Sequence, residues 1–108
     1  MTDIFESATN NDGRFAGVYE DDGETAYFYL YDLAGDGRIL DHVLIHSGEG
    51  GPLESDVTIR WDNRGEKVAL FIRGELWAWF DPVAREKQGG NYVAGSTPDF
   101  PRPASFSN

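Results

Sequence analysis

The chain has 108 residues, a formal net charge of −10, 40% hydrophobic residues and no cysteine. This length predicts a single domain with enough apolar side chains for a core, and the lack of cysteine excludes disulfides, thiolate metal sites and a cysteine nucleophile. No segment approaches the roughly 20 consecutive apolar residues of a membrane-spanning helix.

The negative charge is confined to the first half of the chain. Residues 1–54 carry 12 acidic side chains against two cations, Arg14 and Arg38, whereas residues 55–108 carry seven of each sign. This surplus disfavours nucleic acid as a partner, because phosphate recognition needs Lys and Arg to displace counterions. It fits either a solubilising surface or an acidic face for a basic protein. The N-terminal residues lack the pattern of a signal peptide, and together with the missing cysteine this predicts a cytoplasmic protein.

The first predicted elements form a hairpin. Residues 1–12 are polar and are predicted to be a loose N-terminus. Alternation of apolar and polar residues then predicts strands at 15–20 and 25–31, joined by the turn Asp21-Asp22-Gly23-Glu24, because Asp-Gly tolerates the positive φ of hairpin turns. The second strand places three tyrosines on one face, opposite a row of core residues. These tyrosines are Tyr27, Tyr29 and Tyr31.

Further strands are predicted at 38–46, 56–62, 67–73 and 76–81, with a glycine-rich loop over 47–55. A two-residue turn at Gly74-Glu75, of type II′ because glycine comes first, is expected to join the last two. The final strand has Trp77 and Trp79 on one side. Residues 96–108 contain three prolines and predict an irregular tail, pinned by Phe100.

These elements predict an all-β domain over residues 13–95, with about six antiparallel strands. No connection is long enough to require a parallel pairing. Two architectures remain open, a sandwich of two sheets and a curled, barrel-like meander.

Two segments carry a likeness to known proteins. The first is the acidic hairpin Tyr19–Tyr29, with its sequence Glu-Asp-Asp-Gly-Glu-Thr followed by aromatic residues. The second runs from Trp61 through Gly65 to Phe80 and Asp81. In this order they resemble a small bacterial family of uncharacterised proteins, a domain of unknown function. The resemblance implies a bacterial, intracellular protein and brings no catalytic residues.

Known catalytic and metal-binding patterns are not matched. His42 and His46 lie four apart on a predicted strand, roughly 13 Å at about 3.3 Å per residue, too far to share one metal ion. The acidic turns do not have the spacing of a calcium loop, and no nucleophile triad or phosphate-binding glycine loop is present. We therefore predict no enzyme activity, no metal and no cofactor.

The predicted function is protein binding inside the cell. The acidic turn residues Asp21, Asp22 and Glu24, with the face of Tyr27, Tyr29 and Tyr31, would contact a basic partner. The alternative is a carbohydrate-binding domain in which Trp77 and Trp79 form an aromatic platform. A third interpretation is that both aromatic rows only pack within the protein, because large apolar side chains are usually buried. Exposed edges of an open sheet would allow a dimer.

Overall fold

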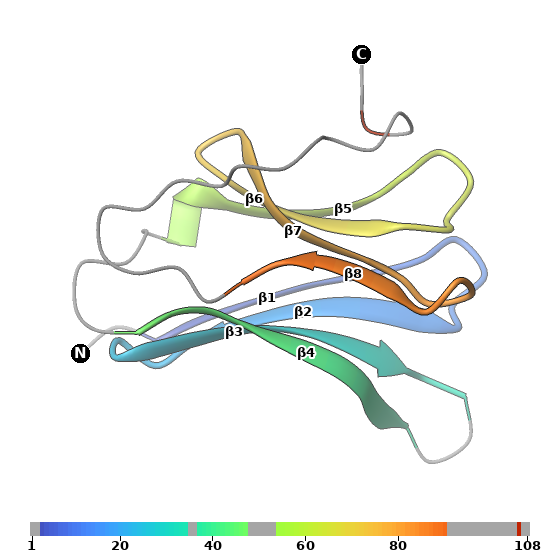
Figure 1. Ribbon diagram of the computed structural model, residues 1–108, viewed down its shortest axis with the longest axis horizontal. Helices are drawn as coiled ribbons and strands as arrows, with labels where there is room; N and C mark the ends of the chain where they lie inside the picture. Colours follow the sequence, from blue (N-terminus) through green and yellow to red (C-terminus); the bar gives the residue numbers. More distant parts are fainter. Residues whose placement is uncertain (1–2, 35–36, 48–53, 91–105, 107–108) are drawn as a thin grey trace.

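Two four-stranded antiparallel sheets make up the computed structural model, which describes residues 3–34, 37–47, 54–90 and 106 (Figure 1). The first sheet contains, in sequence order, β1 (Ile4–Thr9), β2 (Phe15–Asp21), β3 (Thr25–Asp32) and β4 (Arg38–Ser47). The second contains β5 (Val57–Trp61), β6 (Val68–Ile72), β7 (Glu75–Asp81) and β8 (Glu86–Gly89), and a short 3-10 helix, η1 (Glu54–Asp56), precedes it. The predicted all-β antiparallel class is confirmed. The two separate sheets give a sandwich and not a closed barrel.

Strand β1 lies where the sequence predicted a loose N-terminus, so that prediction is wrong for Ile4–Thr9. Pairing along all of β1 with β2 stabilises it. The turn between them is held by Asn10, whose side-chain oxygen accepts hydrogen bonds from the backbone N–H groups of Arg14 at 3.0 Å and Phe15 at 3.1 Å. Asn10 is buried, and its side chain replaces backbone partners that the turn cannot supply.

Strand β8 is the second element that the sequence did not predict. Its residues Glu86–Gly89 are polar or glycine, and they form a strand because the preceding turn directs them back along β7. The Asp81 carboxylate holds that turn by accepting hydrogen bonds from the backbone N–H groups of Val83 at 3.1 Å and Ala84 at 3.0 Å. The described residues therefore form eight strands, where the sequence predicted about six.

The hairpin between β6 and β7 turns one residue earlier than predicted. Glu75 already belongs to β7, so the two turn residues are Arg73 and Gly74, with φ values of 53° and 81°. Positive φ at both positions defines a type I′ turn, which matches the twist of the paired strands. The Arg73 side chain is paired with Asp56 at 3.2 Å.

The main core fills the space between the two sheets. The rings of Phe28 on β3 and Phe80 on β7 are stacked across this space, with centroids 5.1 Å apart. Both side chains are almost completely buried. Around them lie aliphatic residues of both sheets, so each sheet covers the apolar face of the other.

A second, smaller core lies on the outer side of the second sheet. Phe106 is buried there, and its ring lies 5.9 Å from that of Phe71. The Arg60 guanidinium lies 4.8 Å from the Phe71 ring centroid, which adds a cation–π contact. The rest of the predicted tail, including Phe100, lies outside the described residues.

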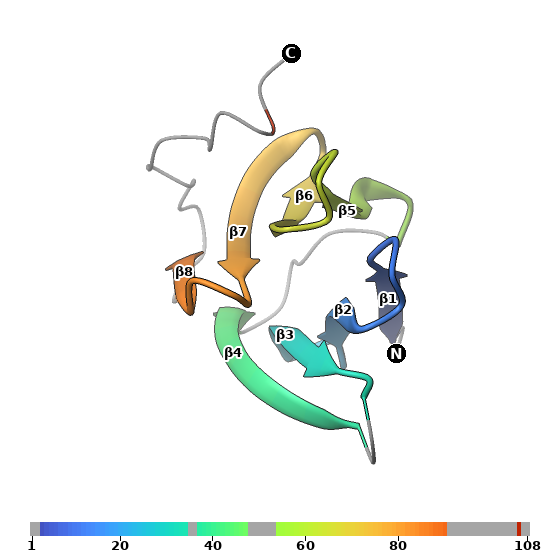
Figure 2. The same cartoon turned by 90° about the vertical axis from the view of Figure 1, so that its right-hand side faces the viewer.

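One edge of the sandwich is closed by a direct contact between the sheets. Figure 2 shows β1 beside β5 at this edge, while β4 lies near β7 and β8 at the other. The Trp61 indole N–H on β5 donates a hydrogen bond of 2.8 Å to the backbone carbonyl of Ala8 on β1. This bond fixes the edge of one sheet against that of the other.

Candidate functional site

The predicted tyrosine row lies on the outer face of the first sheet, away from the second sheet. Alternation along β3 directs Ala26, Phe28 and Leu30 into the core and leaves the tyrosines half-buried on the opposite face. The rings of Tyr27 and Tyr29 are stacked with centroids 5.8 Å apart. Tyr31 meets Tyr29 edge-on at 6.4 Å. The row is therefore a continuous aromatic surface that solvent reaches.

His42 extends this surface on the neighbouring strand. It pairs with Tyr29 in the β3–β4 register, and its ring centroid lies 5.9 Å from that of Tyr27 and 6.4 Å from that of Tyr29. His42 is exposed. Together these four residues, Tyr27, Tyr29, Tyr31 and His42, are called the tyrosine face below. The contribution of His42 was not predictable from the sequence, because it depends on the register between β3 and β4.

The side chains of the tyrosine face cover small residues of the sheet and are also partly exposed to solvent. Val18 and Ala16 on β2 pair with Tyr29 and Tyr31, so they lie on the same side of the sheet. They are only 6% and 5% exposed, which means that larger neighbouring side chains cover them. The tyrosines thus bury small residues with one part of each ring and present the remainder to solvent.

A carboxylate borders the tyrosine face. Glu20 on β2 pairs with Tyr27 and is exposed. The pKa of Tyr29 is raised, first by the partial burial of its hydroxyl and then by the negative charge of Glu20, with smaller contributions from Tyr27 and Tyr31. The tyrosine face therefore lies in a negative local potential.

We expect Glu20→Gln to lower the pKa of Tyr29 toward its ordinary value of 10.0, because removing the negative charge makes the phenolate less unfavourable. A residue-resolved NMR titration of the tyrosine rings would measure this change. Glu24→Gln is the matched control and should leave Tyr29 unchanged. An unaltered pKa of Tyr29 in the Glu20 variant would contradict the effect assigned to the Glu20 charge.

The acidic turn divides into a buried and an exposed part. Asp21 is only 4% exposed, accepts a 2.8 Å hydrogen bond from the Gly23 N–H and a 3.2 Å bond from the Tyr19 hydroxyl, and belongs to the framework of the turn. The expectation that Asp21 contacts a partner directly is therefore corrected. Asp22 and Glu24 are exposed, and backbone N–H donors of Thr25 and Glu24 lower the pKa of Asp22.

The predicted tryptophan row is not formed. A register shift between Leu70 and Phe71 in the β6–β7 ladder places the two indoles in different environments. Trp77 packs against the main core, whereas Trp79 belongs to the smaller outer core and is 8% exposed. Without a shared exposed face, Trp77 and Trp79 make no platform for a sugar ring.

A pocket that the sequence analysis did not anticipate opens between the sheets, with a volume of about 390 Å³. It lies where the start of β2, the end of β3 and the start of β4 face the β7–β8 hairpin. Both charged and apolar side chains line it. Its lining residues are Arg14, Phe15, Leu30, Asp32, Arg38, Leu40, Asp41, Phe80, Asp81, Pro82, Arg85 and Glu86.

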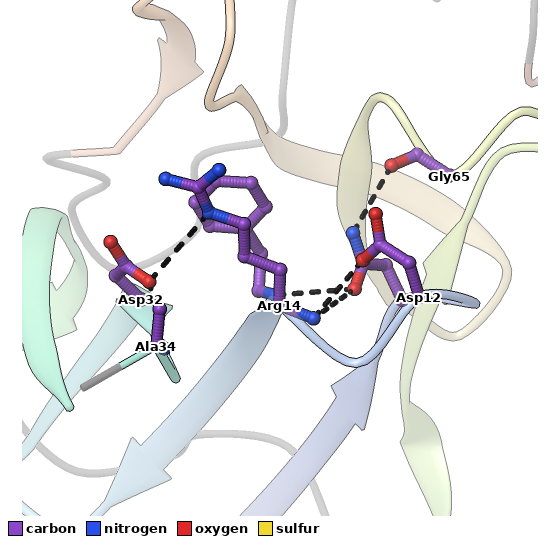
Figure 3. A network of polar contacts seen from close by, with 7 residues as sticks. Asp12, Arg14, Asp32, Ala34 and Gly65 are labelled. Carbon is purple, nitrogen blue, oxygen red and sulfur yellow. Dashed lines mark hydrogen bonds and ion pairs between the residues drawn. The ribbon is translucent and has the colours of Figure 1, made fainter. Parts of the chain in front are cut away.

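Arg14 is held in place at the wall of this pocket. Its guanidinium lies 4.0 Å from the Asp32 carboxylate (Figure 3) and 5.0 Å from the Phe15 ring centroid. The backbone N–H of Arg14 donates a hydrogen bond of 3.0 Å to the carboxylate of Asp12. The charge pattern of the sequence could have indicated this pocket. Arg14 and Arg38 are the two cations of residues 1–54, and both line the pocket.

Two lysines pair with aspartates that line the pocket. Lys67 lies 3.3 Å from Asp81, and Lys87 donates a 2.8 Å hydrogen bond to Asp41. Partial burial acts to raise the pKa of Asp41, but the bond from Lys87 and the backbone N–H of His42 outweigh it and lower this pKa. Asp41 is consequently ionised and paired with Lys87 at neutral pH.

Within the described ranges, no group of three or more His, Asp or Glu side chains is placed to hold a metal ion. The same part of the chain contains no helix with the length and apolar character needed to cross a bilayer.

The chain matches a family model described as an uncharacterized protein conserved in bacteria (DUF2251) over residues 2–99. It is also 33% identical over 72 residues to an uncharacterized protein of Haemophilus influenzae. That match covers 63% of this chain and 45% of the relative, so the chain spans less than half of the relative's length. No solved structure matches.

Proposed function

We propose that this chain, which belongs to a bacterial family of uncharacterised proteins, is a non-enzymatic interaction domain that binds a basic segment of a partner protein. The observation that carries the proposal is the tyrosine face, an aromatic surface open to solvent and bordered by the carboxylate of Glu20. Its proposed site of action is the cytoplasm, because a chain without cysteine forms no disulfides and needs no oxidising environment.

The chemistry of the face suits arginine side chains. A guanidinium stacks on tyrosine rings, with a gain of about 0.5–1 kcal/mol at exposed sites. Exposed carboxylates at Glu20, Asp22 and Glu24 would attract the same cations. The net charge of −10 would also accelerate the encounter at low salt.

Exposed apolar residues on the same face add contact area. Phe5, 60% exposed, pairs with Glu20, and Ile39, 47% exposed, pairs with Tyr31. They lie at opposite borders of the tyrosine face, on β1 and β4. A basic segment that crosses the sheet from β1 to β4 would therefore meet apolar, acidic and aromatic groups in turn.

A short peptide of alternating Arg and Gly, titrated into isotopically labelled protein, tests this proposal. The largest chemical-shift changes are expected in β3, β4 and Glu20. The double variant Tyr27→Ser/Tyr29→Ser should bind about tenfold more weakly, because two ring contacts of roughly 0.7 kcal/mol are lost. Tyr27→Phe/Tyr29→Phe keeps both rings and should bind like the unaltered protein.

A second pair of variants separates the local acidic border from net charge. Glu20→Lys/Glu24→Lys should slow association at about 50 mM salt far more than Glu54→Lys/Glu66→Lys, which makes the same change in net charge elsewhere. Equal effects of the two pairs, or shift changes spread over the whole surface, would show that the peptide senses only overall charge and would refute the proposed site.

A further inference from the structure

We propose that the pocket between the sheets binds a small organic anion that carries a carboxylate or phosphate on an apolar body. This site is separate from the tyrosine face, because the pocket lining contains none of its residues. At about 390 Å³ the pocket lies near the lower end of the ~300–1,000 Å³ range typical of small-molecule sites.

The charges around the pocket favour an anion despite the acidity of the whole protein. Its three aspartates each have a cationic partner, with the distances given above for Asp32, Asp41 and Asp81. Arg38 and Arg85 also line the pocket, and no ion pair is formed by either among the described residues. When the charges of these paired groups are set aside, the lining retains the two positive charges of Arg38 and Arg85 and the one negative charge of Glu86.

These two arginines come from different sheets. Arg38 begins β4, and Arg85 ends the turn between β7 and β8. A carboxylate or phosphate has several acceptor oxygens and binds guanidinium groups through paired hydrogen bonds. An anion that contacts both arginines would relieve the repulsion between their like charges. It would also connect the two sheets at the end of the sandwich where the pocket opens.

The backbone of Arg85 gives an independent argument. Its φ is 59°, in the left-handed region, where glycine is the least strained residue. Arg73 has a similar φ, but its side chain is tied to Asp56. Arg85 lines the pocket instead, so a long cationic side chain occupies a turn position that glycine would fit with less strain.

An apolar body on the ligand is indicated by the rest of the lining. Phe15, Leu30 and Phe80 form the inner part, where the pocket meets the main core. The half-open rim is provided by Leu40, which is 40% exposed, and by Pro82. A ligand with its charged end at the arginines and its apolar end on these residues would match both parts.

Phenylacetate and phenyl phosphate are suitable probes, and neutral phenylacetamide is the control. Each is titrated into the labelled full chain and followed by NMR. Binding of one or both anions, with shift changes at the pocket lining and little response to phenylacetamide, is the expected result. The preferred anion distinguishes a carboxylate from a phosphate ligand. Equal binding of phenylacetamide, or no binding of either anion at millimolar concentration, would overturn the proposal.

Arginine variants then test the assignment. Arg38→Gln and Arg85→Gln should each weaken binding of the preferred anion about tenfold or more, as expected for a lost charged hydrogen bond. Arg64→Gln, on an exposed turn outside the pocket, is the control and should bind normally.

Arg85→Gly should weaken binding equally while the thermal midpoint stays constant or rises, because glycine relieves the left-handed backbone. Unchanged affinity in the Arg38 and Arg85 variants would refute the site, and normal binding of the Arg-Gly peptide by them keeps this test independent of the tyrosine face.

Discussion

Replacing Phe28 with alanine is expected to lower the free energy of unfolding by about 3–5 kcal/mol. Phe28 is completely buried, and its ring stacks on that of Phe80 from the opposite sheet. The substitution removes apolar area from the core and leaves a cavity that the surrounding strands fill only in part. Because a domain of this size is stabilised by about 5–15 kcal/mol in total, the loss would be a large fraction of its stability.

Urea unfolding followed by tryptophan fluorescence would measure the effect of Phe28→Ala. Phe5→Ala is the matched control, because Phe5 is 60% exposed and its removal should change stability by no more than about 0.5 kcal/mol. If Phe28→Ala cost less than about 1 kcal/mol, the stacked Phe28–Phe80 pair would not be the centre of the contact between the sheets.

Gly17→Ala is expected to destabilise the protein by about 1–3 kcal/mol through overpacking. Gly17 lies in the middle of β2, where the two sheets approach closely. A Cβ atom at this position would lie 2.6 Å from the Val68 Cγ2 atom and 3.1 Å from the Ile59 Cγ2 atom. Val68 is fully buried, so it has no solvent-facing space into which to move.

A double-mutant cycle identifies the cause of the Gly17→Ala loss. Val68→Ala alone should cost about 2–3 kcal/mol as a cavity, but Gly17→Ala/Val68→Ala should cost at least ~1 kcal/mol less than the sum of the single changes, because the new methyl occupies the space that the valine vacates. Chemical denaturation of all four proteins gives the coupling. Strict additivity would mean that the sheets do not meet at Gly17 and Val68.

The strands with strong alternation were predictable from the sequence, and those without it were not. From Ala26 to Leu30 every second residue is buried, and the alternation that produces this pattern is visible in the sequence of the strand. Glu86–Gly89 has no apolar side chain, so its strand conformation depends on β7 and on the turn held by Asp81. In Ile4–Thr9 only Ile4 is buried, and the pairing with β2 outweighs its weak pattern.

The candidate sites were likewise predictable only where they depend on alternation within one strand. The sequence placed Tyr27, Tyr29 and Tyr31 on one face, because strand alternation alone determines that relation. It could not place Trp77 and Trp79, since the irregular register at Leu70 and Phe71 separates residues that alternation would put together. The pocket brings together residues from both sheets, and no local pattern reports how two sheets pack against each other.

The order of the strands has a consequence for how the chain folds. Among the described strands, every hydrogen-bonded pair joins neighbours along the chain, from β1–β2 to β7–β8. Most loop closures are therefore short, and long-range contacts are needed chiefly to dock one sheet on the other. All-β proteins usually fold slowly because they must form many distant pairings. In this topology each sheet assembles by adding one hairpin after another, so folding should be fast for an all-β chain, with docking of the sheets as the slow step.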